Sequence, residues 1–145
     1  MSVRNIDKGF YKVTGGGGST DIPPTNYNLG WSGAFTATTK AIFSKSNGIV
    51  NVHMNPVMGT AVVNDYIQCQ IPEQFKPTSI SGTSYPVFVN ISNSNIIIGT
   101  LFISFPMPSY PVFRISSTPT GSVQNFTVGD TVGIQFQFNF SYLAD

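Results

Sequence analysis

The segment Thr131–Tyr142 constrains the fold of this chain more than any other part of the sequence. Uncharged polar residues alternate there with an apolar or aromatic set: Val132, Ile134, Phe136, Phe138, Phe140 and Tyr142. Successive side chains of a strand point to opposite faces of a sheet, so this unbroken period of two predicts a single long strand with one apolar face. Burial of such a set stabilises a fold by about 10 kcal/mol before entropic costs. We therefore expect this strand to anchor the core.

The rest of the chain has the composition of an all-β domain. Its 145 residues suffice for one domain. β-Branched and aromatic residues, including 12 Phe and 6 Tyr, outnumber the strong helix formers, which excludes an all-helical protein. Alternating segments and turn residues follow one another from Trp31 onward, and the strands predicted before Thr131 are residues 34–45, 49–55, 58–63, 66–71, 86–91, 95–105, 110–116 and 122–128. We expect an antiparallel β-sandwich of roughly eight strands with jelly-roll-like connections.

One hairpin turn can be placed from two residues. Asn47-Gly48 lies between two predicted strands. Asn-Gly is the strongest local signal for a two-residue turn, because both positions take a positive φ. The returning strand should then place Val50, Val52 and Met54 on its apolar face.

Residues 1–30 differ from the remainder and predict a flexible N-terminal arm. The run Gly15–Gly18 would lose much backbone entropy inside a sheet, and Pro23-Pro24 follows it. We therefore divide the chain into an arm with a glycine-rich joint, residues 1–30, and a β-sandwich head domain, residues 31–145. The alternative is that the glycine run is an engineered insertion and not natural sequence.

Charge and composition exclude several classes of function. Only 9% of the residues are charged and the net charge is +1, which provides no basic surface for nucleic acid. With one His and one Cys, the chain cannot build a zinc cage or a Cys–His relay, so we expect no metal, no cofactor, no catalytic residue and no internal disulfide. Met1–Lys8 lacks the apolar stretch of a secretion signal, and the longest apolar tract, Ile96–Phe105, is too short to span a bilayer. We expect a soluble, non-enzymatic protein that does not insert into membranes.

The polar positions of the predicted strands suggest that copies of the chain associate. These positions carry Ser, Thr, Asn and Gln in place of the charged residues that keep most exposed sheets apart. Uncharged groups lose their hydration at lower cost than ionised ones. We expect a homo-oligomer, and the alternative is a monomer with a solvated Ser/Thr/Asn-rich surface.

The segment Ile71–Pro77 predicts a rigid corner. Pro72 removes a hydrogen-bond donor from the ladder and ends the preceding strand. Pro77 keeps Lys76 out of the helical region of backbone conformation. Phe75 lies between the two prolines, where it can fill the end of the sandwich.

Three features together resemble the trimeric β-sandwich heads at the tips of bacteriophage tail fibres and related viral fibre proteins. They are the corner Ile71–Pro77, the hairpin at Asn47-Gly48 and the aromatic-rich final segment Phe136–Tyr142. The resemblance covers about the whole predicted head domain. Gln74 and Lys76 depart from the family pattern, which has a small residue and an arginine at these positions.

The resemblance implies a homotrimeric module that attaches a virion to a receptor or glycan on the host surface. The N-terminal arm would fasten this head to a shaft or to the capsid, so the expected location is the virion surface. The first alternative is a minor capsid or virion decoration protein, and the second is a stand-alone carbohydrate-binding module. A cytokine-type trimer is disfavoured because no secretion signal is evident.

Three residues are candidates for receptor contact. Met107 and Tyr110 lie in a proline-rich loop, and Tyr85 precedes Pro86. A stiff loop loses little entropy when it binds a partner, and such aromatic and Met side chains provide contact area. The alternative is that each of them caps an end of the core.

The remaining polar motifs have ordinary structural explanations. His53 is expected to be a single hydrogen-bonded surface histidine; the alternative is a ring of histidines around a three-fold axis. Cys69 should be a buried structural thiol. Asp65 and Asp130 lie in turn contexts, where Asp commonly binds the local backbone. We read the three glycosylation motifs as chance matches, at Asn90, Asn125 and Asn139.

Overall fold

The structure, a computed structural model, describes residues 20–78, 84–92, 95–107, 110–118 and 126–144. Within these residues the secondary structure consists of strands and one short 3₁₀-helix, η1 (Glu73–Phe75). The strands are β1 (Ile22–Gly33), β2 (Ala37–Ser46), β3 (Ile49–Met54), β4 (Val57–Thr60), β5 (Ile67–Gln70), β6 (Ser84–Ser92), β7 (Asn95–Met107), β8 (Tyr110–Ser116), β9 (Thr131–Ile134) and β10 (Phe138–Leu143).

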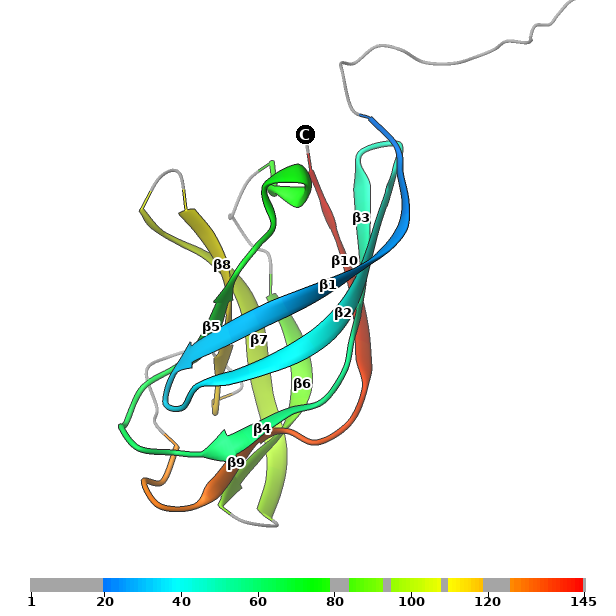
Figure 1. Ribbon diagram of the computed structural model, residues 1–145. Coiled ribbons are helices and arrows are strands. Elements are labelled where there is room, and N and C mark those ends of the chain that lie inside the picture. Colours follow the sequence, from blue (N-terminus) through cyan, green and yellow to red (C-terminus); the bar gives the residue numbers. More distant parts are fainter. Residues whose placement is uncertain (1–19, 79–83, 93–94, 108–109, 119–125, 145) are drawn as a thin grey trace, which may run out of the picture.

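All the strands belong to one antiparallel sheet of 10 strands, in the order β10-β3-β2-β1-β5-β8-β7-β6-β9-β4. The sheet curls so that its two halves face each other across the core (Figure 1). Phe43 of β2 stacks on Phe113 of β8 with ring centroids 6.1 Å apart. In the same way, the ring centroids of Tyr85 of β6 and Phe140 of β10 lie 5.3 Å apart. The predicted all-β antiparallel sandwich is therefore confirmed, with 10 strands in place of the roughly eight expected.

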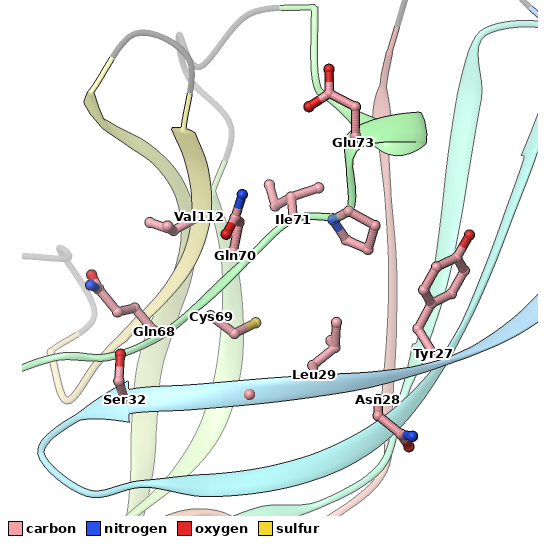
Figure 2. Close-up of a pocket in the computed structure, with 12 residues that line it drawn as sticks. Tyr27, Asn28, Leu29, Ser32, Gln68, Cys69, Gln70, Ile71, Glu73 and Val112 are labelled. Atoms are coloured by element: carbon pink, nitrogen blue, oxygen red, sulfur yellow. The ribbon is translucent and has the colours of Figure 1, made fainter.

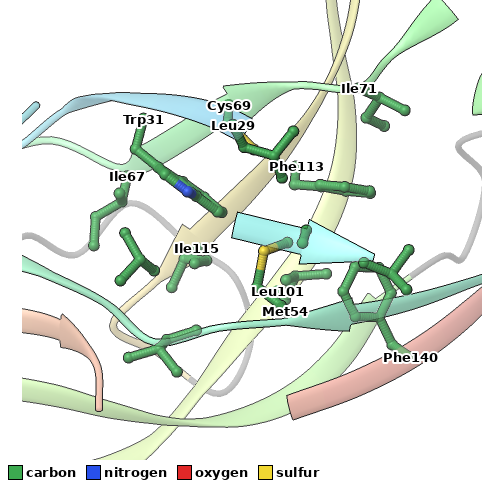
Figure 3. Close-up of a cluster of buried hydrophobic side chains, with 14 of the residues drawn as sticks. Leu29, Trp31, Met54, Ile67, Cys69, Ile71, Leu101, Phe113, Ile115 and Phe140 are labelled. Atoms are coloured by element: carbon green, nitrogen blue, oxygen red, sulfur yellow. The ribbon is translucent and has the colours of Figure 1, made fainter. Parts of the chain in front are cut away.

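Aromatic and branched side chains from both halves form a continuous core (Figure 3). Phe43, Phe75 and Phe113 are fully buried, and Trp31 lies almost completely inside. The rings of Phe43 and Phe75 stack with centroids 4.9 Å apart. Because this row of rings joins β2, η1 and β8, it links segments that are distant in sequence.

The hairpin between β2 and β3 forms at the predicted turn. Asn47 and Gly48 both have positive φ, 52° and 77°, as a two-residue turn of this kind requires. Val50, Val52 and Met54 are buried on the inner face of β3, which confirms the predicted alternation.

The prediction of one long strand over residues 131–142 is wrong, because the segment forms two strands. β9 pairs with β6 and β4, whereas β10 pairs with β3 in the other half of the sheet. The chain leaves one half at Ile134 and joins the other at Phe138, and Phe136 in the connection is 51% exposed. Alternation of apolar and polar residues indicates which side chains share a face of a strand. It does not indicate where the chain leaves one neighbouring strand and pairs with another.

The predicted boundary between arm and head is also wrong over residues 22–30. These residues lie in β1, which pairs with β2 from Ile22 to Trp31 and buries Leu29 and Trp31. The register shifts between Ile22 and Thr25, where the two prolines lie. Proline is tolerated at the start of a strand, so Pro23-Pro24 did not mark a linker. Residues 1–19 of the predicted arm lie outside the described residues.

The strand predicted at residues 122–128 is not seen where the structure describes it. Residues 126–128 are not in a strand, although Phe126 is fully buried. Residues 122–125 lie outside the described part of the chain.

Candidate functional site

The corner after β5 closes one end of the core. Pro72 precedes η1, Phe75 is fully buried, and Pro77 is buried in an isolated bridge with Ala144. The hydroxyl of Tyr142 donates a hydrogen bond of 2.8 Å to the carbonyl of Phe75 in the interior. Burial raises the pKa of the Tyr142 phenol, so it remains protonated and able to donate.

Tyr85, one of the candidate contact residues, is half-buried and joins the two halves of the sheet. Its hydroxyl donates a hydrogen bond to the carbonyl of Ser141, and its ring packs on Phe140. Burial raises the pKa of this phenol as well. Because β10 ends the sheet order, the hydroxyl covers part of an edge that would otherwise be open to pairing.

The other two candidates lie at a different place along the sheet. Met107 pairs with Tyr110 at the end of the β7–β8 hairpin. Tyr85 pairs with Leu101, six residues before Met107 along β7, which corresponds to about 20 Å in an extended strand. The structure therefore does not bring the three candidates into one cluster, and their role in receptor contact stays a prediction.

A groove of about 360 Å³ lies between β1 and β5 (Figure 2). The two strands pair over only three residues, Trp31–Gly33 with Ile67–Cys69. On the N-terminal side of Trp31 the pairs formed by β1 are all with β2, whereas β5 pairs with β8 over its whole length. The strands diverge from this point and leave the groove between their facing edges.

The outer rim of this β1–β5 groove is polar and follows the register of the strands. Ser32 is the cross-strand neighbour of Gln68, and Gln70 lies two residues further on the same face. Gly30 occupies the corresponding place on β1 and provides no side chain; a Cβ atom built there has nothing within 4 Å. The divergence of the strands and the missing side chain opposite Gln70 together leave the groove open.

Three further contacts involve the polar residues around the rim. The Nε of Arg114 donates a hydrogen bond of 2.6 Å to Gln68 Oε1, and its guanidinium lies 4.9 Å above the Tyr66 ring. The amide nitrogen of Gln68 is thereby directed away from Arg114. Glu73, at the far end of the groove, pairs with Lys76 at 3.0 Å.

Apolar side chains lie beneath the groove, whose exposed lining is mostly polar. Leu29, Cys69 and Ile71 line it, and all three are buried. Burial raises the pKa of the Cys69 thiol well above its ordinary value. The thiolate is the reactive form of cysteine, so Cys69 has the environment of the structural thiol expected from the sequence.

Alkylation of Cys69 by iodoacetamide at pH 8 should be at least about 100-fold slower in the folded protein than in urea, because both burial and the raised pKa suppress the thiolate. The rate in the folded protein should rise with pH, since the thiolate forms only as the pH approaches the raised pKa. Mass spectrometry of the intact chain measures the extent of alkylation. Equal rates in the two states would contradict the assigned burial.

The other polar motifs are held by local contacts. His53 Nδ1 lies 2.5 Å from Asn139 Oδ1 on the outer face, and Asp65 accepts a hydrogen bond from the Tyr66 amide. Asn90 is fully buried and its side-chain amide donates to the carbonyl of Thr131. Asn90 is thus inaccessible for glycosylation in the folded chain, whereas Asn125 lies outside the described residues.

The part of the chain that the structure describes holds no cluster of three or more His, Cys, Asp or Glu side chains suited to a metal ion. The same residues include no helix with the length and hydropathy needed to cross a bilayer.

Comparison with known proteins reveals a relationship in structure. No protein-family profile and no curated protein sequence matches the chain. The solved structure of a reovirus attachment protein, sigma1, in complex with alpha-2,3-sialyllactose, matches it with a TM-score of 0.55 and 9% sequence identity. The chain is similar in fold to a viral attachment protein.

The match to sigma1 covers 83% of this chain and 64% of the sigma1 chain, so the chain spans less than two thirds of that structure. The covered share of this chain is large enough to include most of the curled sheet. The resemblance to viral fibre heads inferred from the sequence is therefore confirmed at the level of the fold.

The β1–β5 groove is the feature that sequence reasoning missed. The alternation of Gln68 and Gln70 about Cys69 contributed to the predicted strand. Ser32, the partner of Gln68, fell in the predicted head, but Gly30 and the rest of β1 along the groove fell in the predicted arm. Recognition of Tyr27, Leu29 and Trp31 as an alternating apolar set would have extended the sheet to β1. The groove itself depends on where β1 and β5 diverge, for which the sequence carries no local signal.

Proposed function

We propose that this chain is the non-enzymatic, homotrimeric head of a viral attachment appendage and contacts a receptor or glycan on the host surface. The observation that carries the proposal is the shared fold with the attachment protein sigma1. The head would be displayed on the virion surface, and the residues preceding β1 would fasten it to a shaft or to the capsid. Tyr85, Met107 and Tyr110 remain candidates for receptor contact, in two separate regions of this head.

The outer face of β6 and β7 supports the trimer. Neither strand contains a charged residue. Phe88 and Ile98 are cross-strand neighbours that are 60% and 51% exposed, and Ile96 is exposed on the same face. An uncharged apolar sheet face is prone to association because it loses little hydration free energy when covered. We expect this β6–β7 face to be shared between copies.

Phe88→Lys should convert the trimer to monomers without unfolding the chain. The introduced ammonium would have to lose its hydration in the interface, whereas in the monomer it would remain solvated because this side chain is largely exposed. Light scattering and native mass spectrometry measure the change. Val62→Lys is the matched control, since Val62 is 66% exposed in the connection between β4 and β5 and should leave the trimer intact.

Two outcomes would contradict the trimer. A wild-type chain that is monomeric at micromolar concentration would remove it altogether. A Phe88→Lys variant that remains trimeric would show that copies meet through another face.

Immunogold labelling of intact particles tests the attachment role. We expect gold at the tips of appendages, and we expect the purified chain to compete with particles for adsorption to host cells. Uniform labelling of the capsid would favour the decoration role instead. Absence of competition at concentrations that saturate cell binding would contradict attachment through this domain.

A further inference from the structure

The β1–β5 groove has the architecture of a small-ligand site. Its volume of about 360 Å³ lies at the lower end of the range for small-molecule pockets. Such pockets combine an apolar surface with a few polar groups of fixed direction. In this groove the polar part dominates: Leu29 and Cys69 expose little surface at the bottom, and Gln68 and Gln70 provide amides on the rim.

The facing strand edges add backbone groups to the side chains. β1 is paired with β2 on its other side, and β5 is paired with β8. Past the pair Trp31–Cys69, no described strand pairing joins the two edges that line the groove. Backbone N–H and C=O groups at such an opening are strong hydrogen-bonding groups available to a ligand.

The charges around the groove disfavour an anionic ligand. Among its lining residues the one charged side chain is Glu73, and its carboxylate is paired with Lys76. Arg114 lies behind Gln68, where it donates to the Gln68 oxygen and covers the Tyr66 ring. An anionic ligand would therefore find no unengaged cation along the described lining.

We propose that the β1–β5 groove binds one ring of a neutral saccharide. A sugar ring carries several uncharged hydroxyls, which match a mostly polar lining of amides, a hydroxyl and strand edges. The Gln68 side-chain nitrogen and the amide of Gln70 would bind ring hydroxyls, with Ser32 across the groove. This proposal rests on the attachment role for its biological setting and gives that role a ligand class.

An extended peptide fits the same place less well. A peptide strand would need a continuous ladder on at least one side. β5 ends at Gln70, and Pro72 has no N–H to donate. On the β5 side the opening is therefore too short for an added strand, which favours a compact ligand there.

Saturation-transfer NMR and titration calorimetry with a panel of neutral saccharides (lactose, methyl mannoside and N-acetylglucosamine) test the proposal in the full-length chain. We expect at least one to bind with millimolar affinity or better. Gln70→Ala should weaken that binding about tenfold, because one amide hydrogen-bonding group is lost. Gln135→Ala is the matched control, since Gln135 is an exposed amide in the β9–β10 connection, and it should bind as the wild type does.

A second variant blocks the groove without removing a hydrogen-bonding group. Gly30→Tyr places a ring into the open space opposite Gln70, and tyrosine is favoured in strands. We expect this variant to keep its melting temperature and to lose saccharide binding. Alpha-2,3-sialyllactose should bind no more tightly than lactose, since the described lining offers no unengaged cation for its carboxylate.

The results that overturn the saccharide site differ from those that overturn the attachment role. Absence of binding to every neutral saccharide, or binding unchanged in both Gln70→Ala and Gly30→Tyr, would remove the groove as a saccharide site. If wild-type chain still adsorbs to host cells in that case, the attachment role stands through another surface. Saccharide binding that is lost in the variants, with no adsorption to cells, would support the site and contradict the attachment role.

Discussion

Phe75→Ala is expected to lower the free energy of unfolding by about 3–5 kcal/mol. Phe75 is fully buried at the corner after β5, where its ring stacks on Phe43 and meets the edge of Tyr27 at 5.5 Å. Alanine would leave a cavity at the point where β1, β2 and η1 meet. The same change would loosen the segment whose carbonyl accepts the Tyr142 hydrogen bond.

Urea unfolding followed by the fluorescence of Trp31, the one tryptophan of the chain, measures this loss at a fixed protomer concentration. Phe75→Leu retains most of the volume and should cost about 1–2 kcal/mol, so the test holds even if the alanine variant does not fold. Gln74→Ala is the control, because Gln74 is exposed on the same short helix. A loss below about 1 kcal/mol for Phe75→Ala would show that the corner is not part of the cooperative core.

Gly33→Ala should lower the free energy of unfolding by about 2–4 kcal/mol, almost as much as Phe75→Ala. Gly33 ends β1 with φ +103°, which side chains rarely tolerate, and a Cβ atom there would lie 1.9 Å from the carbonyl oxygen of Tyr66. That carbonyl accepts the hydrogen bond of the Ala34 amide at 2.9 Å. The backbone could not move away without breaking the junction of β1 and β5.

Gly30→Ala is the matched control for Gly33→Ala. It lies three residues earlier in the same strand, and its Cβ atom would meet nothing within 4 Å. We expect the free energy of unfolding to change by no more than about 0.5 kcal/mol, or to rise slightly because alanine lowers the entropy of the unfolded chain. Thermal unfolding of both variants beside the wild type measures the contrast, and equal stabilities for the two would contradict the tight contact at Gly33.

Local sequence determined the features that depend on a few neighbouring residues. Asn47-Gly48 specified its turn because few dipeptides adopt two consecutive positive φ values. Val50, Val52 and Met54 indicated the buried face of β3 because alternation in a strand is a property of the backbone. The segment from Pro72 to Pro77 could be identified as a corner because the effect of proline is also local. Proline fixes its own φ and restricts the backbone conformation of the residue before it.

The choice of strand partners was decided by tertiary structure. Residues 131–142 alternate without interruption, yet the chain crosses between the two halves of the sheet at Gln135–Gln137. β1 contains Pro23-Pro24 and still joins the sheet, because burial of Leu29 and Trp31 against the core outweighs the weak start of the strand.

The sequence by itself therefore determined that this chain is an antiparallel β protein and where its most sharply defined turn lies. Only the tertiary structure decided that β1 and β5 diverge on the N-terminal side of Trp31, that Gly30 comes to lie opposite Gln70, and that an apolar face of β6 and β7 remains uncovered. The physical reason is that turn geometry and side-chain alternation are set by the backbone over a few residues. Strand pairing and grooves arise from packing between segments that are distant in the chain.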